Sequence, residues 1–348
     1  MKLAMNLNYS GNFHADVTQV QELERAGLDL VWIPEAYSFD AISQVGYLAA
    51  KTERIEIGTG IINVFSRTAT AVAQTGAGCD FVSDGRFVLG LGASGPQVIE
   101  GFHGVPYEHP MVRIREYIDV CRMTWRREKV VYDGDTVQIP LPAGQGTGLG
   151  KPLKLINHMQ RPDIPIFWAS LMGKSVTATA RHADGWLPIF FVPETFRSVW
   201  GDELEAGLAE RDPVLGPLSI GTGGLLAIGE EYAGDGADRV LDMARPHTAL
   251  YVGGMGARDK NFYNTIVKKY GYVDEATQIQ DLYLDGHKDE AAAAVPRQLL
   301  ATTNLVGPAG HVAERLAAYQ EAGVTHLSVN PVGPDPVKTI ETLRAMID

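Results

Sequence analysis

The chain has 348 residues, of which 45% are hydrophobic and 21% are charged, a composition that is typical of a globular protein and argues against disorder. The formal net charge of −12 disfavours nucleic acid and anionic membranes as partners. No run of about 18 apolar residues indicates a membrane span. The first residues lack a secretory-signal pattern, so we expect a cytoplasmic protein whose cysteines, Cys79 and Cys121, are buried thiols.

A repeating unit runs along the chain: an amphipathic helix that ends in Ala-Gly or Ala-Asp-Gly, followed by a short apolar strand. It is found at residues 17–33, at residues 176–189 and at residues 312–329. Glycine at the end of a helix suits the left-handed conformation that turns the chain back onto a strand. This repetition is typical of βαβ units that build a parallel sheet.

Short segments that are apolar on both faces are predicted to be buried parallel strands. In chain order they are Lys2–Asn8, Leu30–Pro34, Ile55–Gly60, Phe87–Leu91, Ile164–Ala169, Trp186–Ile189, Leu218–Ala227 and Thr325–Asn330. Eight such units in a chain of this length favour a closed α/β barrel, the (β/α)8 TIM barrel, as a single domain over residues 1–348. The string Gly90–Gly95 has the spacing Gly-x-Gly-x-x-Gly, but it follows the fourth strand and is weak evidence for a dinucleotide-binding fold.

Three segments are additional to the eight βα units of a minimal barrel. A hairpin and a loop rich in glycine and proline are predicted near residues 129–155, a helix within residues 190–216, and a long, mostly helical insertion over residues 251–304. Insertions of this kind usually cover the mouth of the barrel, at the C-terminal ends of the strands, or carry contacts between subunits.

The C-terminal ends of the strands form the active-site face of such barrels, so polar residues there are candidates for function. Glu35 ends an apolar strand and is interpreted either as a proton carrier or as an acid at the start of the next helix. Residues 170–175 open a helix directly after a strand, which indicates either an anion-binding helix N-terminus or a plain turn. His103 and His109 are interpreted as loop anchors, and the sequence has no metal-ligand spacing and no Gly-x-Ser-x-Gly motif.

Residues 54–68 and 83–95, around the third and fourth predicted strands, resemble the bacterial luciferase-like superfamily. The likeness extends to residues 31–35, 164–188 and 321–326. Within the superfamily, the sequence is similar to the branch that uses the deazaflavin coenzyme F420, which includes the methylenetetrahydromethanopterin reductases. The resemblance implies an F420-dependent oxidoreductase that transfers a hydride between C5 of the deazaflavin and a small organic substrate, and it implies a homodimer.

The same resemblance implies a set of cofactor contacts. In deazaflavin-dependent relatives a non-prolyl cis peptide, here the bond between Gly60 and Ile61, forms a bulge behind the ring, and residues 171–174 correspond to the family's phosphate loop. The implied cofactor-binding residues are Glu35, Gly60, Ile61, Asn63, Ala93, Ser94, Gly95, Leu171, Met172, Gly173 and Lys174.

The chain departs from its relatives where protons are handled. Many relatives carry an acid followed by histidine after the second strand, whereas Ala36 follows Glu35 here. Asn6 stands where the pterin reductases carry glutamate, so the pterin substrate is not carried over. The candidates for substrate orientation or proton delivery are Asn6, Glu35, Tyr37 and Gln97. An FMN-dependent monooxygenase and a non-catalytic flavin- or deazaflavin-binding protein are the alternative functions.

Overall fold

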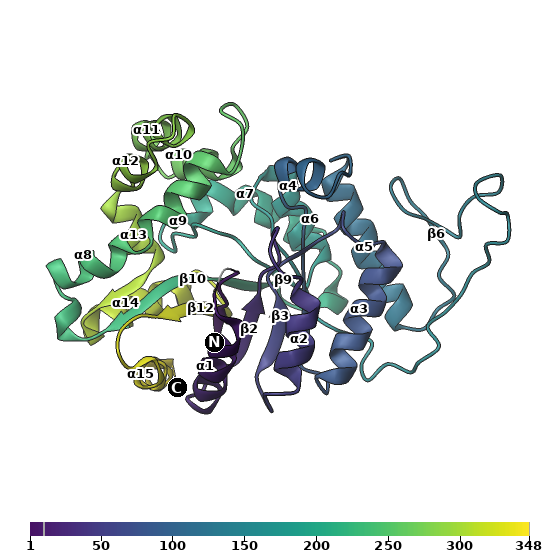
Figure 1. Cartoon of the computed structure of the whole chain (residues 1–348), viewed down its shortest axis with the longest axis horizontal. Coiled ribbons are helices and arrows are strands. Elements are labelled where there is room, and N and C mark those ends of the chain that lie inside the picture. Colours follow the sequence, from purple (N-terminus) through teal and green to yellow (C-terminus); the bar gives the residue numbers. More distant parts are fainter. Residues whose placement is uncertain (10, 348) are drawn as a thin grey trace.

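A closed ring of parallel strands forms the centre of the molecule (Figure 1). The computed structural model of the protein describes residues 1–9 and 11–347. The strands of the ring, in chain order, are β1 (Lys2–Asn6), β2 (Leu30–Ile33), β3 (Glu56–Thr59), β5 (Phe87–Gly92), β8 (Ile166–Trp168), β9 (Gly185–Trp186), β10 (Ser219–Ile228) and β12 (His326–Pro331). Each strand pairs in parallel with the next, and β12 pairs with both β10 and β1, which closes the ring. The predicted TIM barrel is confirmed.

Every predicted strand is present, with ends that shift by a few residues. For example, β1 ends at Asn6 rather than at Asn8, and β9 begins at Gly185 rather than at Trp186. The sequence pattern does not predict two short strands: β4 (Ile62–Asn63), which pairs with β5, and β11 (Leu305–Gly307), which pairs with β10. Both are too short to show an apolar pattern of their own.

Helices cover the outside of the ring. Around the barrel they are α1 (Phe13–Arg25), α2 (Ala41–Ala49), α3 (Ala69–Val82), α4 (Pro96–Gly101), α5 (Pro110–Trp125), α6 (Gly173–His182), α7 (Phe196–Ala209), α14 (Ala309–Glu321) and α15 (Pro336–Ile347). Side chains of Asn12, Asp40 and Thr68 accept hydrogen bonds from first-turn amides and so begin α1, α2 and α3. Cys79 on α3 and Cys121 on α5 are buried free thiols, as predicted. Within the described residues, no helix is long and apolar enough to cross a membrane.

The helical insertion before the last βα unit has its own apolar core. Its helices are α8 (Asp235–Asp242), α9 (Arg245–Ala249), α10 (Phe262–Lys269), α11 (Val273–Leu284), α12 (Lys288–Ala293) and α13 (Arg297–Thr303), with a π-helical turn at Leu250–Gly254. Figure 1 shows α10, α11 and α12 gathered at one edge of the molecule. Buried side chains such as Val252, Ile279 and Leu299 form a cluster separate from that of the barrel. The insertion is helical as predicted, but its helices begin at Asp235 rather than after residue 251.

The segment near residues 129–155 contains the predicted hairpin, made of β6 (Tyr132–Asp133) and β7 (Gln138–Ile139). Its loop extends away from the body of the molecule (Figure 1). The segment joins the end of α5 to the start of β8, and after it Arg161 donates to the Phe87 carbonyl, at the N-terminal end of β5, at 2.6 Å. The hairpin therefore belongs to the end of the barrel opposite the mouth.

Large side chains fill the inside of the barrel. The rings of Trp32 on β2 and Phe167 on β8 meet edge to face at 5.3 Å, and Phe167 meets His326 on β12 at 5.2 Å. Glycines make room for these rings, because a Cβ at Gly58 would lie 2.4 Å from Trp32 and a Cβ at Gly185 would lie 2.2 Å from Phe167. The interior is a packed core, so a ligand has room only at an end of the barrel.

We predict that His326 makes the protein acid-sensitive. Burial, with Lys2 nearby, lowers the pKa of His326 to about 4, so its imidazole is neutral in the folded protein at neutral pH. The unfolded chain takes up this proton near the ordinary pKa of 6.5. As the pH falls from about 6.5 to about 4, the unfolded state gains a proton that the folded state does not, and stability decreases by about 2–3 kcal/mol.

The measurement is urea unfolding at about pH 7 and about pH 4.5, where His326→Gln should show a smaller loss of stability than the wild type. The control is His14→Gln, which removes an exposed histidine from α1 and should behave like the wild type. An equal loss in wild type and His326→Gln would contradict the assignment.

Candidate active site

The end of β3 and the start of β4 form a bulge against β5. The peptide bond between Gly60 and Ile61 is cis, the geometry that the family resemblance implies. On β5, a Cβ at Gly90 would lie 1.8 Å from the carbonyl oxygen of Thr59, and a Cβ at Gly92 would lie 2.8 Å from Ile61. These two glycines of the Gly-x-Gly-x-x-Gly string therefore serve close strand packing.

Gly90→Ala is predicted to destabilise the fold by about 3 kcal/mol or more, because the new methyl group would overlap the Thr59 carbonyl, which is backbone and cannot rotate away. Urea unfolding measures the loss. The matched control is Gly78→Ala in α3, where a Cβ meets nothing within 4 Å and helix propensity favours alanine by up to about 1 kcal/mol. Equal stability of Gly90→Ala and Gly78→Ala would refute the close approach of the strands.

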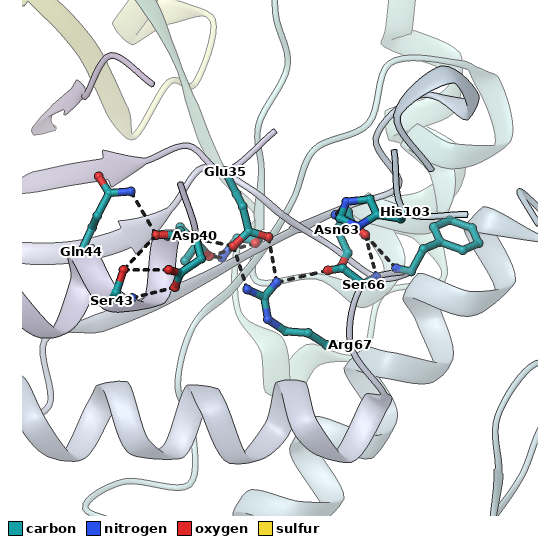
Figure 2. Close-up of polar contacts among 12 residues, drawn as sticks. Glu35, Asp40, Ser43, Gln44, Asn63, Ser66, Arg67 and His103 are labelled. Atoms are coloured by element: carbon teal, nitrogen blue, oxygen red, sulfur yellow. Dashed lines mark hydrogen bonds and ion pairs between the residues drawn. The ribbon is translucent and has the colours of Figure 1, made fainter. Parts of the chain in front are cut away.

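Glu35 follows β2 and is buried. Its carboxylate accepts two hydrogen bonds from Arg67, at 2.7 and 2.8 Å, and one from the backbone N–H of Ala41, at 3.0 Å (Figure 2). The bidentate contact with Glu35 raises the pKa of the Arg67 guanidinium. Because both carboxylate oxygens are occupied and one of them caps α2, the geometry favours the helix-start interpretation over the proton carrier.

Asn63 is also engaged within the protein. Its side-chain oxygen accepts hydrogen bonds from the backbone N–H groups of Phe65 and Ser66, at 3.0 and 2.8 Å, and its side-chain nitrogen lies 3.4 Å from Nε2 of His103 (Figure 2). The side chain thus holds the turn that follows β4 and links it to the loop after α4. His103 is the loop anchor that the sequence indicates, and His109 begins α5.

The remaining predicted residues lie at the mouth and are accessible. Partly exposed are Gly60, Ile61, Ala93, Ser94, Gly95, Leu171, Met172 and Gly173; exposed are Asn6, Tyr37, Gln97 and Lys174. Those predicted to contact the cofactor follow β3, β5 and β8, which are neighbours in the ring, so they lie along one arc of the mouth. Asn6 lies on β1, outside this arc, and its backbone N–H donates to the Asn330 side chain at 3.3 Å.

The start of α6 has the geometry of an anion site. Two buried indoles, Trp186 and Trp200, donate to the carbonyl oxygens of Ser170 and Leu171 at 2.9 and 2.8 Å. A trans peptide directs its C=O and N–H to opposite sides, so the N–H of Leu171 points away from the Trp186 ring. The N–H of Met172 donates to the Ser175 hydroxyl at 3.2 Å, so the Leu171 N–H, the positive end of the helix dipole and the exposed Lys174 are the groups that favour a negatively charged ligand.

Four aromatic residues also meet at the mouth; none of them is among the predicted cofactor-binding or catalytic residues, although Phe190 falls in the strand-end segment 188–191 that the strand-end rule singles out. We call them the mouth aromatics: Tyr9 after β1, Phe190 after β9, and Tyr251 and Tyr263 from the insertion. The hydroxyl oxygens of Tyr9 and Tyr251 lie 3.1 Å apart, and the ring of Tyr251 meets that of Tyr263 edge to face at 4.8 Å. The signal for Tyr9 and Phe190 is their position just beyond a strand; nothing in the sequence places Tyr251 or Tyr263 beside them.

Surface hollows also exist at the opposite end of the barrel, lined by residues such as Lys2, Asp29 and Arg344. Asp29 there accepts a hydrogen bond from the Leu3 amide at 2.7 Å and pairs with Arg344 of α15, so these charges hold the barrel end together. The predicted site residues lie at the mouth, and we place the site there. Within residues 1–9 and 11–347, no group of three or more His, Cys, Asp or Glu side chains is arranged to hold a metal ion.

We predict that Glu35→Gln lowers the free energy of unfolding by about 2–4 kcal/mol, because it leaves the half-buried Arg67 without its counter-charge. The double variant Glu35→Gln/Arg67→Met removes both charges and should recover part of the loss in a double-mutant cycle. Glu56→Gln breaks the more exposed pair with Lys2 and is the control, with an expected loss below about 1 kcal/mol. A Glu35→Gln protein as stable as the wild type would contradict the structural role.

Comparison with known proteins supports one family. The model of the luciferase-like monooxygenase family matches residues 2–326. Over 348 residues, 99% of each chain, the sequence is 36% identical to a Mycobacterium tuberculosis protein named as a putative coenzyme F420-dependent oxidoreductase. It is 26% identical over 332 residues to 5,10-methylenetetrahydromethanopterin reductase of Archaeoglobus fulgidus, covering 93% of this chain and 92% of the reductase.

The fold is shared with a solved structure, the coenzyme F420-dependent tetrahydromethanopterin reductase from Methanopyrus kandleri. The TM-score is 0.79 at 21% identity, and the match covers 98% of this chain and 96% of the reductase. The closed barrel, the cis bulge and these matches agree with the resemblance seen in the sequence. The chain belongs to the luciferase-like monooxygenase family.

Proposed function

We propose that the protein is a coenzyme F420-dependent oxidoreductase that transfers a hydride between C5 of the deazaflavin and a small organic substrate. The observation that carries the proposal is the arc formed by the bulge at Gly60 and Ile61, the loop after β5 and the start of α6. The name of the M. tuberculosis relative, which matches over 99% of its length, supports the choice of cofactor.

The residues of the arc fit a molecule with a flat ring at one end and a phosphate further along. Ile61 is partly exposed at the bulge and offers an aliphatic surface to one face of a ring. Ala93, Ser94 and Gly95 follow β5, the middle strand of the arc, and leave space for a linker because their side chains are small. The α6 N-terminus and Lys174 stand at the far end, where a phosphate would be neutralised.

When bound, F420 supplies or accepts a hydride at its C5 atom. The protein's part is to hold the ring in one orientation against the bulge, which lowers the entropic cost of reaching the reactive geometry. Trp32 and Phe167 fill the barrel below the mouth and leave no path for water from that side. The Glu35–Arg67 ion pair ties the loop after β2 to the loop after β4, next to the proposed ring site.

We predict saturable binding of F420 to the wild-type protein, measured by the change in deazaflavin fluorescence, and binding of FMN that is at least about tenfold weaker. Lys174→Met should raise the dissociation constant of F420 by about 3–30-fold and reduce its dependence on salt, because one cation near the phosphate is lost. Lys151→Met, on the loop that extends from the body, is the matched control and should bind like the wild type.

Tight binding of FMN without binding of F420 would overturn the proposal in favour of an FMN-dependent enzyme. If Lys174→Met binds F420 as tightly as the wild type, Lys174 does not contact the phosphate. The choice between F420 and FMN would still be decided by the titration of the wild-type protein.

A further inference from the structure

The family histidine that would handle a proton is absent, and the carboxylate beside it is occupied. Ala36 stands in the position that follows Glu35, and Glu35 itself is held by Arg67 and by the start of α2. When a hydride is added to a carbonyl carbon, or removed from the carbon of an alcohol, the oxygen on that carbon must gain or lose a proton. A side chain that gives or takes this proton is therefore still needed. The mouth aromatics include three phenols that can do this, those of Tyr9, Tyr251 and Tyr263.

Tyr9 and Tyr251 form a pair of phenols that joins two distant parts of the chain. Their hydroxyl oxygens lie 3.1 Å apart, and either one can be the donor. Two hydroxyl groups carry two donor hydrogens, and their mutual hydrogen bond uses one of them. The second O–H and the remaining lone pairs are available to a ligand, and Tyr9 is 41% exposed.

The position of the pair is fixed from both sides. Ser38, in the loop after β2, donates to the backbone carbonyl of Tyr9 at 2.6 Å. The ring of Tyr251 lies 6.4 Å from that of Phe190 and 4.8 Å from that of Tyr263, both in edge-to-face contact. The pair is therefore a rigid polar group set among aromatic rings.

The pair lies at the mouth, close to the arc proposed for the cofactor. Burial, followed by the influence of Tyr9 and Tyr107, raises the pKa of Tyr263 to about 12. Geometry also links the pair to the arc, because Ser38, which donates to the Tyr9 carbonyl, follows β2, and β2 is the neighbour of β3, where the arc begins. Burial, with Tyr9 next, also raises the pKa of Tyr251, so this phenol keeps its proton at neutral pH. Tyr251 and Tyr263 are therefore neutral phenols at the mouth.

We propose that the Tyr9–Tyr251 pair binds the oxygen of the substrate and delivers its proton, and that the substrate is a flat, uncharged ketone or aldehyde. Phe190 and Tyr263 provide the aromatic walls that favour a flat apolar molecule, and neutral phenols do not offset the cost of burying a charge. This inference rests on the proposed function and names its substrate class and proton donor.

In the direction of reduction, a phenol of the pair gives one proton to the carbonyl oxygen. With reduced F420 bound, a hydride would form the C–H bond at the carbonyl carbon as the C=O π bond breaks, and the substrate would gain two electrons and become an alcohol. The phenolate regains its proton from solvent, and the ring proton that leaves the cofactor on its two-electron oxidation goes to solvent. No further oxidant or reductant is needed.

The test uses acetophenone as a flat aryl ketone and the F420-loaded protein. We expect acetophenone to change the fluorescence of bound oxidised F420 in a saturable way, and we expect the reduced form to be oxidised by it. Tyr9→Phe and Tyr251→Phe should each lower kcat about tenfold or more, and the double variant by about 100-fold. The dissociation constant of F420 should stay within about twofold, because the contact proposed for the pair is with the substrate oxygen.

Tyr47→Phe, which removes an exposed phenol that packs against Phe13 on the outside of the barrel, is the matched control and should keep the wild-type kcat. Thermal melting checks that each variant folds. A purely structural latch predicts a lower melting temperature with kcat unchanged, and that result overturns the inference. Binding of F420 without binding of acetophenone also overturns it, but leaves the proposed function standing; failure of the wild type to bind F420 overturns the proposed function itself.

Discussion

Thr59 on β3 and Gly90 on β5 exchange two hydrogen bonds, in which the threonine hydroxyl donates to the Gly90 carbonyl and accepts from the Gly90 amide, both at 2.9 Å. This contact brings two strands so close that no side chain fits at Gly90. The bulge at Gly60 and Ile61 begins one residue later, and the partly exposed Ile61 side chain lies against Gly92 of β5. The proposed cofactor site is built around this bulge.

The polar residues around the mouth fall into two groups with different tasks. Glu35, Asn63 and Arg67 spend their hydrogen bonds inside the protein, where they hold the loops after β2 and β4. Tyr9 and Tyr251, at the mouth, share one hydrogen bond, so one of their two O–H groups can still donate to a ligand. A buried carboxylate whose oxygens are already bonded is a poor proton shuttle, whereas an accessible neutral phenol can serve as one. The first group thus holds the loops in place, and the proposed proton transfer falls to the second group.

Much of the fold follows from local sequence. The recurring helix, glycine and strand predict the parallel barrel, because each unit carries its own apolar pattern and helix cap. The cis bond at Gly60 was accessible only through family resemblance, since no local pattern of residue types requires it. The strands β4 and β11 are too short to produce a periodic signal.

The site was predicted less well, for a physical reason. The strand-end rule identifies which residues reach the mouth, but it does not show what each side chain bonds to. The partner of Glu35 is Arg67, which follows a different strand, so the sequence alone could not show that the carboxylate is occupied and left both interpretations open. Tyr9 and Tyr251 are 242 residues apart in the sequence, and only the folded barrel brings their hydroxyl groups together. Long-range side-chain pairing is set by tertiary structure and leaves no trace in local periodicity.

The most direct measurement is a crystal structure of the protein with F420 bound. We expect the deazaflavin ring to lie against the Ile61 side of the bulge and the phosphate to lie at the start of α6 beside Lys174. The Tyr9–Tyr251 pair should lie near C5 of the ring and away from the phosphate. A phosphate bound away from α6, or a ring bound at the other end of the barrel near Lys2 and Arg344, would contradict this arrangement.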